Sequence, residues 1–297
     1  MNVTTFAKVA IFSIICNHNR HIHNQNHYLC IMQDNITSLP PEIITLTNER
    51  GLFAATTCRG GTAYDTDAYS GFSLCHYSGD NETHFNKCHN QLAEWCAIEP
   101  EKIFVPRQTH SPNVTTITQE NLADNRPDNC DALVTRMPGI IIGINTADCV
   151  PVLMYDRENG VIAAAHAGWR GAIEGIIKNT INAMIRLKAD SASIKAIICP
   201  AICSNCFEVG EEVASLFTEN RVIRHGHLRP HVDLPGYVKD CIENEGLIPQ
   251  NILLTKECTR CQPMKYFSAR ASGIKSGRNY SFIMLRKHCD EACGDCS

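Results

Sequence analysis

The sequence lacks an excess of charge of either sign. Its 27 lysine and arginine residues nearly balance 31 aspartate and glutamate residues, so the formal net charge is −4 and the isoelectric point is near 6.3. Nucleic-acid backbones and acidic membranes bind strongly basic surfaces. The charge balance therefore argues against both partners and favours a small-molecule substrate.

A long hydrophobic run is also missing. The apolar stretch near the N-terminus, residues 7–16 (AKVAIFSIIC), is too short to span a bilayer. No clear small-x-small cleavage site follows it, so secretion is not favoured, and a true start at Met32 explains the stretch equally simply. We predict a cytoplasmic protein with an N-terminal extension at residues 1–42.

No Pro/Ser-rich linker, block of like charge or internal repeat divides the chain after this extension. One domain of residues 43–287, followed by a cysteine-rich tail of residues 288–297, is therefore the simplest organisation. With 44% hydrophobic and 20% charged residues, the chain can bury a substantial core.

Strand-like and helix-like patterns alternate along this domain. Short apolar, β-prone runs predict strands, and apolar residues spaced by three or four predict a helix over residues 171–187. The other expected elements are strands at residues 139–145, 150–155, 161–165 and 194–199, and helices at residues 211–217 and 233–246. This order predicts a single α/β to α+β domain with a mixed sheet flanked by helices.

Seventeen cysteines are many for a chain of this size. They are spread over ample apolar sequence, so we interpret most of them as reduced and buried rather than as a disulfide framework. Cys258 and Cys261 form a CxxC pair, and the tail contains one more histidine and three more cysteines. A second metal site built from these residues is an alternative, although a structural zinc site usually has two such pairs in an ordered frame.

Metal-capable side chains occur in three short segments at the edges of apolar runs: residues 108–111 (QTHS), 146–151 (TADCVP) and 166–171 (HAGWRG). A residue just beyond a buried strand can point into a shared cleft while the strand holds it in place. His110, Cys149 and His166 are therefore candidates to converge.

Two imidazoles and one thiolate suit Zn²⁺ and leave a fourth tetrahedral position for water or substrate. The same donors also suit copper, so the type of ligand leaves the metal open. The separations of 39 and 17 residues match no compact zinc motif. From spacing alone, packing of a lone histidine or cysteine in the core is the commoner interpretation.

Arginines in glycine- or serine-containing turns offer an anion site. Arg170 lies in the HAGWRG segment, where two glycines permit a ligand to approach the backbone. Arg59, Arg270 and Arg278 lie in similar turns, and a guanidinium recognises phosphate through a bidentate fork. For each arginine taken alone, a solvated surface charge is the alternative.

The order of several motifs resembles the laccase-domain purine nucleoside phosphorylases, a family once called multicopper polyphenol oxidases. The motifs are GINTADCVPVLMYD, AAAHAGWRGA and CPAICSNCFEVGEEV. The resemblance continues through residues 232–234, 258–259, 267–270 and 277–278 and covers roughly residues 52–285. It implies the fold of that family, which is similar to that of cytotoxic necrotizing factor.

The resemblance implies that His110, Cys149 and His166 bind zinc. It also implies phosphorolysis of purine nucleosides, adenosine and inosine among them, with methylthioadenosine phosphorylase and adenosine deaminase activities. Zinc with an open position suits attack of water on C6 of adenine, whereas phosphorolysis needs cationic groups such as Arg170 to position phosphate. Asp148, beside the cysteine, would either orient an imidazole or serve as an acid/base.

The chain departs from the family pattern in several places, among them Ser111, which stands where the family has a glycine after the histidine. The family's Thr-Arg-x-Gly-Gly is replaced by residues 57–61 (TCRGG), which places a cysteine at the arginine position and Arg59 one residue later. Ser73 stands where the family has an amide that could contact ribose or phosphate. We assign Arg59, Ser73, Arg170 and Arg270 to phosphate or substrate binding and expect an altered substrate preference.

Two alternatives belong to other functional classes. A copper-dependent polyphenol oxidase would need many histidines in HxH pairs, and the clearest pair, His21 and His23, lies in the N-terminal extension. A non-catalytic zinc-binding module would gain support if Cys203 or Cys206 supplied a fourth ligand. We expect a monomer or homodimer that binds purine nucleoside and phosphate.

Overall fold

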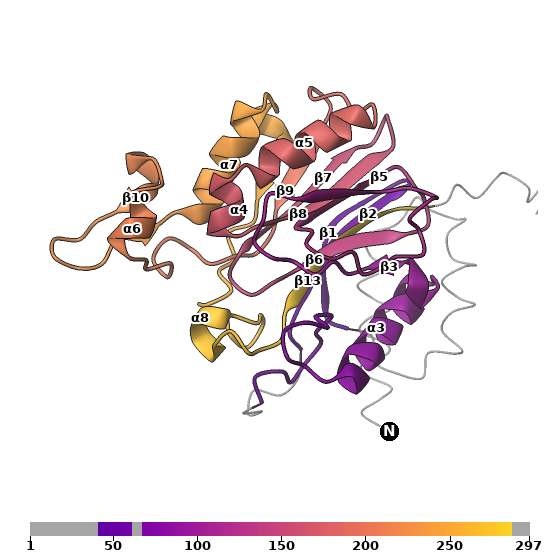
Figure 1. The fold of residues 1–297 in the computed structure, drawn as a ribbon, viewed down its shortest axis with the longest axis horizontal. Helices are drawn as coiled ribbons and strands as arrows, with labels where there is room; N and C mark the ends of the chain where they lie inside the picture. The colour runs from indigo at the N-terminus through magenta and orange to yellow at the C-terminus, as the bar shows by residue number, and fades with distance from the viewer. Residues whose placement is uncertain (1–40, 61–66, 287–297) are drawn as a thin grey trace, which may run out of the picture. The chain divides into compact units, whose positions relative to one another are not determined.

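The computed structural model describes residues 41–60 and 67–286, all within one compact unit. Residues 1–40 of the predicted extension, and the predicted tail, lie outside the described residues. Two β-sheets stack face to face, and helices cover the outer face of each (Figure 1). The prediction of a mixed α/β fold flanked by helices is confirmed, with two large sheets in place of one.

The six-stranded sheet has the order β12-β9-β7-β8-β5-β4. Its strands are β4 (Val114–Ile117), β5 (Ala132–Thr135), β7 (Val150–Asp156), β8 (Val161–Ala167), β9 (Lys195–Ile198) and β12 (Ile252–Leu254). The pairs β7–β8, β7–β9 and β5–β8 are antiparallel, whereas β4–β5 and β9–β12 are parallel. The sheet is therefore mixed, and its central strands β7 and β8 are buried along their whole length.

The five-stranded sheet has the order β1-β2-β13-β6-β3. Its strands are β1 (Ile43–Glu49), β2 (Leu52–Thr57), β3 (Ile103–Phe104), β6 (Ile141–Thr146) and β13 (Asn279–Leu285). All its pairs are antiparallel except β3–β6. A short antiparallel pair, β10 (Val222–Ile223) and β11 (His231–Val232), lies apart from both sheets in the strand pairing.

Strand β8 illustrates how the sheets divide the core. Successive side chains of a strand point to opposite faces. Ala163 and Ala165 pack with the helices outside the sheet, while Ile162 and Ala164 pack against the five-stranded sheet. A strand buried on both faces reads as a continuous apolar run, which is why VIAAA predicted it so clearly.

The helices are α3 (Glu82–Cys96), α4 (Trp169–Ile173), α5 (Ile176–Arg186), α6 (Glu211–Ala214), α7 (Leu234–Asn244) and α8 (Ala269–Ser272). Single turns of 3₁₀-helix lie at Pro100–Lys102, Glu219–Arg221 and Pro249–Asn251. α5 and α7 cover the six-stranded sheet and α3 covers the other (Figure 1). The core thus has three layers of side chains, one between the sheets and one under each set of helices.

The helix predicted over residues 171–187 is wrong as a single element. It is divided into α4 and α5 by Gly175, whose φ of 92° lies in the left-handed region that glycine adopts without strain. α6 is also shorter than predicted, since it ends at Ala214. The predicted helix over residues 233–246 is observed as α7, with the Asp233 side chain accepting a hydrogen bond from the Gly236 N–H.

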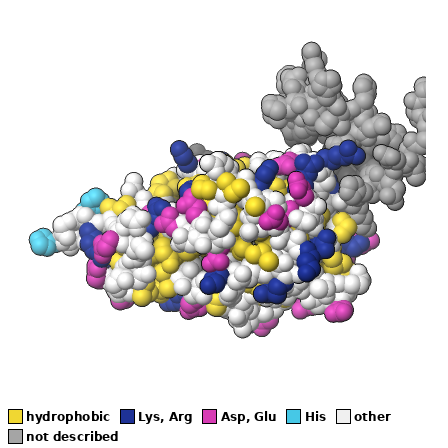
Figure 2. Space-filling model, turned by 90° about the horizontal axis from the view of Figure 1, so that it is seen from above, with side chains coloured by type: hydrophobic (Ala, Val, Ile, Leu, Met, Phe, Trp, Pro, Cys, Tyr) yellow, Lys and Arg dark blue, Asp and Glu magenta, His cyan; other side chains and the backbone are white. Residues whose placement is uncertain are grey.

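Cysteines fill the interior as predicted: among the described residues, twelve are free and seven of these are buried. Within the same residues, no helix has the length and apolar character needed to cross a membrane. On the face drawn in Figure 2, basic and acidic side chains are interspersed, in keeping with the nearly balanced charge.

Candidate metal centre

The three predicted metal ligands converge in the folded chain. The candidate donor atoms of His110, Cys149 and His166 all lie within 4.8 Å of one another. The Cys149 Sγ is 3.8 Å from His110 Nε2, and the two imidazole rings meet edge to face with centroids 4.8 Å apart. The cluster therefore has the donor types and the compactness that one metal ion requires.

The β7–β8 pair brings two of these residues together. Cys149 directly precedes β7, and His166 lies near the end of β8, where it pairs in register with Pro151. Because the strands are antiparallel, the start of one lies beside the end of the other. His110 comes from the loop between β3 and β4, which has to be held against this edge by other contacts.

Buried Asp131 holds that loop and orients one imidazole. Its carboxylate accepts hydrogen bonds from the backbone N–H groups of Thr109 (3.0 Å), His110 (3.0 Å) and Ser111 (2.8 Å). Its Oδ1 also lies 2.7 Å from His166 Nδ1. This contact leaves His166 Nε2 available for a metal, as in the carboxylate–histidine–metal arrangement of many sites.

The sequence interpretation missed Asp131. The available signal was an acidic residue placed directly before a buried strand, β5, where a carboxylate at full burial requires several partners. That position has the same character as those of the three predicted ligands, each at the edge of an apolar run. Asp131 would therefore act on a metal only indirectly, through His166. The atoms that would face the metal are nitrogen and sulfur.

The electrostatics of the cluster favour a bound cation. Burial raises the pKa of the Cys149 thiol, but the neighbouring His166 charge and the hydrogen bond with His110 lower it to about 6. Burial lowers the pKa of His166, but the Cys149 charge and the hydrogen bond to Asp131 raise it to about 9. His166 thus holds a proton between two anions, and a metal ion on Nε2 would take the place of that proton.

The loop that carries His110 is fixed by a buried amide. Gln108 Nε2 donates to the Asn145 carbonyl on β6 (2.8 Å), and the Asn145 N–H donates to Gln108 Oε1 (2.7 Å). His110 itself has a left-handed backbone with φ of 60°. Such a conformation in a residue with a side chain is retained only where the surroundings enforce it. The Gln-x-His motif therefore combines an anchor and a candidate ligand.

Asp148, expected either to orient an imidazole or to serve as an acid/base, has both carboxylate oxygens engaged by other groups. Its Oδ1 accepts from the Thr259 hydroxyl (2.7 Å) and its Oδ2 from the Arg270 N–H (2.6 Å). Its backbone carbonyl accepts from the Ile202 N–H (2.9 Å). Asp148 is thus a positioning residue that ties the Cys149 loop to two other segments, while Asp131 takes the orienting role.

The site is open on one side. His166 is buried, Cys149 is partly buried and His110 is exposed, so a ligand can reach the cluster from solvent. Gly168 contributes to this space: a Cβ added there would lie 2.6 Å from His110 Cδ2 and 3.3 Å from Cys149 Sγ. The donor set and the free space at Gly168 fit a metal ion with a fourth position available to water or substrate.

Gly168→Ala is therefore expected to weaken metal binding at this cluster, tested with zinc, by about 10- to 100-fold, the range found for disturbed neighbours of metal ligands. Gly168 has φ of −66°, which alanine also adopts, so the effect comes from the collision with His110. Gly210 is a matched control, because it also precedes a helix, with φ of −78°, and its added Cβ would meet mainly the Glu212 side chain. Competition with a chromophoric chelator measures both affinities, and equal affinities for the two variants would contradict the prediction.

The predicted phosphate-binding residues have different surroundings. Arg170 is exposed, stacks on the Trp169 ring at 4.3 Å and has no carboxylate partner within the described part of the chain. Arg270 is also exposed, and its Nη1 donates to the Glu208 carbonyl. Arg59 stacks on Phe267 and donates to two backbone carbonyls. Of the three, Arg170 retains the most hydrogen-bonding capacity for an anion.

Ser73 does not fit its predicted role. Its side chain is fully buried, and its hydroxyl oxygen accepts a hydrogen bond from the Arg278 N–H (3.0 Å). A group with no exposed surface cannot contact phosphate or ribose in this conformation. Ser73 instead fixes the segment that leads into β13.

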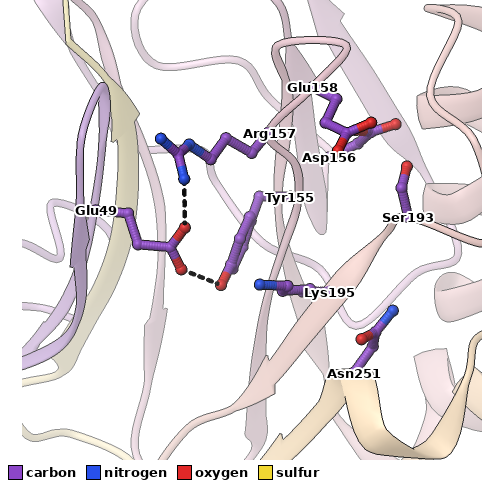
Figure 3. Close-up of a pocket in the computed structure, with 8 residues that line it drawn as sticks. All are labelled: Glu49, Tyr155, Asp156, Arg157, Glu158, Ser193, Lys195 and Asn251. Carbon is purple, nitrogen blue, oxygen red and sulfur yellow. Dashed lines mark hydrogen bonds and ion pairs between the residues drawn. The ribbon is translucent and has the colours of Figure 1, made fainter.

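A pocket of about 530 Å³ lies at the opposite end of β7 from Cys149 (Figure 3). Seven residues of extended strand separate the two ends by roughly 23 Å. In this pocket Glu49 accepts a hydrogen bond from the Tyr155 hydroxyl and pairs with Arg157. It contains none of the three predicted metal ligands and is separate from the candidate metal centre.

A family model described as multi-copper polyphenol oxidoreductase laccase matches residues 53–286. This chain belongs to that laccase-domain family. Relatives of this laccase-domain protein include adenosine deaminase RL5 from an unknown prokaryotic organism, 37% identical over 78% of this chain and 94% of the relative. A purine nucleoside phosphorylase from Bacteroides thetaiotaomicron is 36% identical over 78% of this chain and 90% of the relative.

Solved structures share the fold of this laccase-domain protein. The crystal structure of Bacillus licheniformis hypothetical protein YfiH has a TM-score of 0.77 at 24% identity and covers 83% of this chain and 97% of that one. YlmD from Geobacillus stearothermophilus has a TM-score of 0.73 at 24% identity, with coverage of 80% and 93%. The predicted family and its fold are therefore confirmed.

Within the part of the chain that the structure describes, no site with several histidines matches the copper in the family's description. Among the described residues, the histidine-containing donor cluster has two histidines and one cysteine. The HxH pair His21 and His23 lies outside the described residues. Cys203 and Cys206, considered above as sources of a fourth ligand, belong to a different cluster with Cys258 and Cys261.

Proposed function

We propose that this protein is a zinc-dependent purine nucleoside phosphorylase that cleaves adenosine, inosine and methylthioadenosine with phosphate and also deaminates adenosine. The observation that carries the proposal is the compact cluster of His110, Cys149 and His166, open to solvent on one side. The names of the two relatives, a purine nucleoside phosphorylase and an adenosine deaminase, support the same chemistry.

Two features favour zinc over copper. The proposed reactions on the nucleoside involve no change of oxidation state, and the donor set suits zinc. Two imidazoles, one thiolate and an open position are typical of catalytic zinc. A multicopper oxidase would need several copper ions, each with its own histidines. When bound, zinc would supply a Lewis acid at the open side of the cluster.

Phosphorolysis places clear demands on the residues around the cluster. An oxygen of phosphate forms a bond to C1′ of the ribose while the C1′–N9 bond breaks. The electron pair of the broken bond leaves with the purine, which then takes up a proton. Arg170 is suited to hold the phosphate, because its exposed guanidinium stacks on Trp169 and is kept in place. Arg270 would contribute a second cationic group, since its backbone N–H donates a hydrogen bond to Asp148, the residue before Cys149.

Deamination of adenosine uses a different nucleophile at the same place. Water adds to C6 of the purine, and ammonia leaves as inosine forms. The acid/base group for this step is proposed to come from the exposed side of the cluster, because both Asp148 oxygens are already engaged by Thr259 and Arg270. The side of the cluster nearest His110 is the exposed one.

The Cys149 thiol supports a cytoplasmic location. A site that needs the free Cys149 thiolate works best in a reducing compartment. A single chain contributes all three donors, so the proposed site forms in a monomer or in each subunit of a homodimer.

Phosphate-dependent release of free base tests this proposal. Purified zinc-loaded protein is expected to form adenine from adenosine and hypoxanthine from inosine only with phosphate, together with an equal amount of ribose 1-phosphate. Adenosine should also yield ammonia and inosine without phosphate. Removal of zinc by a chelator should abolish each product, and added zinc should restore it.

A parallel assay of phenol oxidation with copper-loaded protein separates the alternative function. Oxidation of phenols with no base release would favour the polyphenol oxidase. If zinc-loaded protein released no base and no ammonia, and copper-loaded protein oxidised no phenol, the site would be non-catalytic and the proposal would fail.

A further inference from the structure

A second cluster of four cysteines lies apart from the His110 ligand set. The Sγ atoms of Cys203, Cys206, Cys258 and Cys261 all lie within 4.8 Å of one another, and Cys206 Sγ is 3.4 Å from Cys261 Sγ. We propose that these four thiolates bind a second zinc ion in a closed, structural site. This inference is independent of the proposed phosphorolysis.

Two neighbouring strands bring the cysteine pairs together. β9 and β12 run parallel, with Ile198 opposite Leu254. The segments that leave the same edge of the sheet stay side by side, since Ala201 forms a parallel bridge with Cys258 and the Thr259 N–H donates to the Ala201 carbonyl (3.2 Å). Two CxxC pairs separated by 55 residues therefore meet by the topology of the sheet.

Each pair lies in a tight backbone turn. The Cys206 N–H donates to the Cys203 carbonyl (3.0 Å), and the Gln262 N–H donates to the Cys258 carbonyl (3.2 Å). The Cys203 N–H also donates to Cys258 Sγ (3.3 Å), a hydrogen bond that stabilises a thiolate. The backbone thus holds the sulfur atoms in place before a metal binds, as two CxxC turns do in structural zinc sites.

The sulfur separations fit a tetrahedral ion better than a disulfide. Zn–S bonds of about 2.3 Å place the sulfur atoms of a tetrahedron about 3.8 Å apart. The 3.4 Å between Cys206 and Cys261 is close to this value and far from the S–S bond of about 2.05 Å. Four thiolates also complete the coordination sphere, so the site would have no open position for substrate.

The location of the cluster gives it a role beside the catalytic loop. Thr259 lies between the two cysteines of the second pair and donates to Asp148, and Ile202, beside Cys203, donates to the Asp148 carbonyl. Asp148 directly precedes Cys149. The second zinc ion would therefore fix both turns that hold the Cys149 loop.

Metal analysis of the full-length chain tests the proposal. Elemental analysis of wild-type protein is expected to find two zinc ions per chain, one for each cluster, and Cys258→Ser/Cys261→Ser should lower the zinc content by one ion per chain. The matched control Cys289→Ser/Cys293→Ser, which removes the same number of thiols from the tail, should leave the content unchanged. An unchanged zinc content in Cys258→Ser/Cys261→Ser would overturn the proposal.

Cys149→Ala gives a second readout that keeps the four cysteines intact, in case the double variant does not fold. X-ray absorption spectroscopy of the zinc that remains should show four sulfur ligands at about 2.3 Å. Three results would overturn the proposal: absence of zinc from Cys149→Ala, iron bound by four sulfur atoms in place of zinc, or a disulfide-linked peptide that joins the two CxxC segments. Because these readouts do not depend on base release, failure of the proposed enzyme activity would leave this test unaffected.

Discussion

Cys149→Ala is expected to abolish both phosphorolysis and deamination. The thiolate supplies the only anionic donor of the three-residue cluster in the described chain, and its loss removes one of three metal ligands. The expected fall in kcat/KM exceeds the roughly 10- to 100-fold that changes around the ligands typically cause. The fold should persist, because Cys149 lies partly exposed in a loop before β7. Steady-state kinetics and zinc analysis on the same preparation measure the two effects together.

Cys241→Ala is the matched control for this experiment. Cys241 is a partly buried thiol on α7 that belongs to neither cysteine-containing cluster. Its replacement should leave the zinc content and kcat/KM near the wild-type values. Full activity of zinc-loaded Cys149→Ala would remove this cysteine from the site and with it the basis of the proposed function.

Asp131→Asn is expected to weaken zinc binding by about 10- to 100-fold. It should also lower the free energy of unfolding by about 3 kcal/mol, since the N–H donors that surround this buried position lose their charged acceptor. The Asp131 carboxylate accepts hydrogen bonds from His166 and from three successive backbone N–H groups, and an amide nitrogen in place of either oxygen would face these donors. Zinc competition and urea unfolding of the zinc-free protein separate the two effects.

Asp128→Asn serves as the control, because that carboxylate lies in the same loop but is 66% exposed and pairs with Arg107 on the surface. An exposed pair of this kind contributes little to stability. If Asp131→Asn behaved like Asp128→Asn in both measurements, the orienting role of Asp131 would be wrong.

Local patterns in the sequence predicted the core strands and drew attention to three candidate ligands. The apolar runs before and after TADC became β6 and β7, because strands buried on both faces carry little else than apolar residues. His110, Cys149 and His166 stood out as polar residues at the edges of such runs. Their meeting could be inferred only from the family resemblance, since separations of 39 and 17 residues form no local motif.

The spacing of apolar residues did not predict that the segment after His166 forms two helices. The apolar stripe continues across Gly175, so periodicity indicates one helix, whereas the positive φ at that glycine divides it in two. Ser73 was assigned to substrate because of its position in a motif. The packing of the segment before β13 buries it instead.

The alternation of buried strands and amphipathic helices could be predicted from the sequence, because it depends on residue type and short-range spacing. The order of motifs indicated the family, and through that resemblance it named His110, Cys149 and His166 as candidate metal donors. Which groups distant in the chain come together depends on the pairing of the strands. Asp131 reaches His166 because β5 pairs with β8, and Cys203 and Cys206 reach Cys258 and Cys261 because β9 and β12 are parallel neighbours. Strand pairing joins residues far apart in the chain, and no local pattern specifies it.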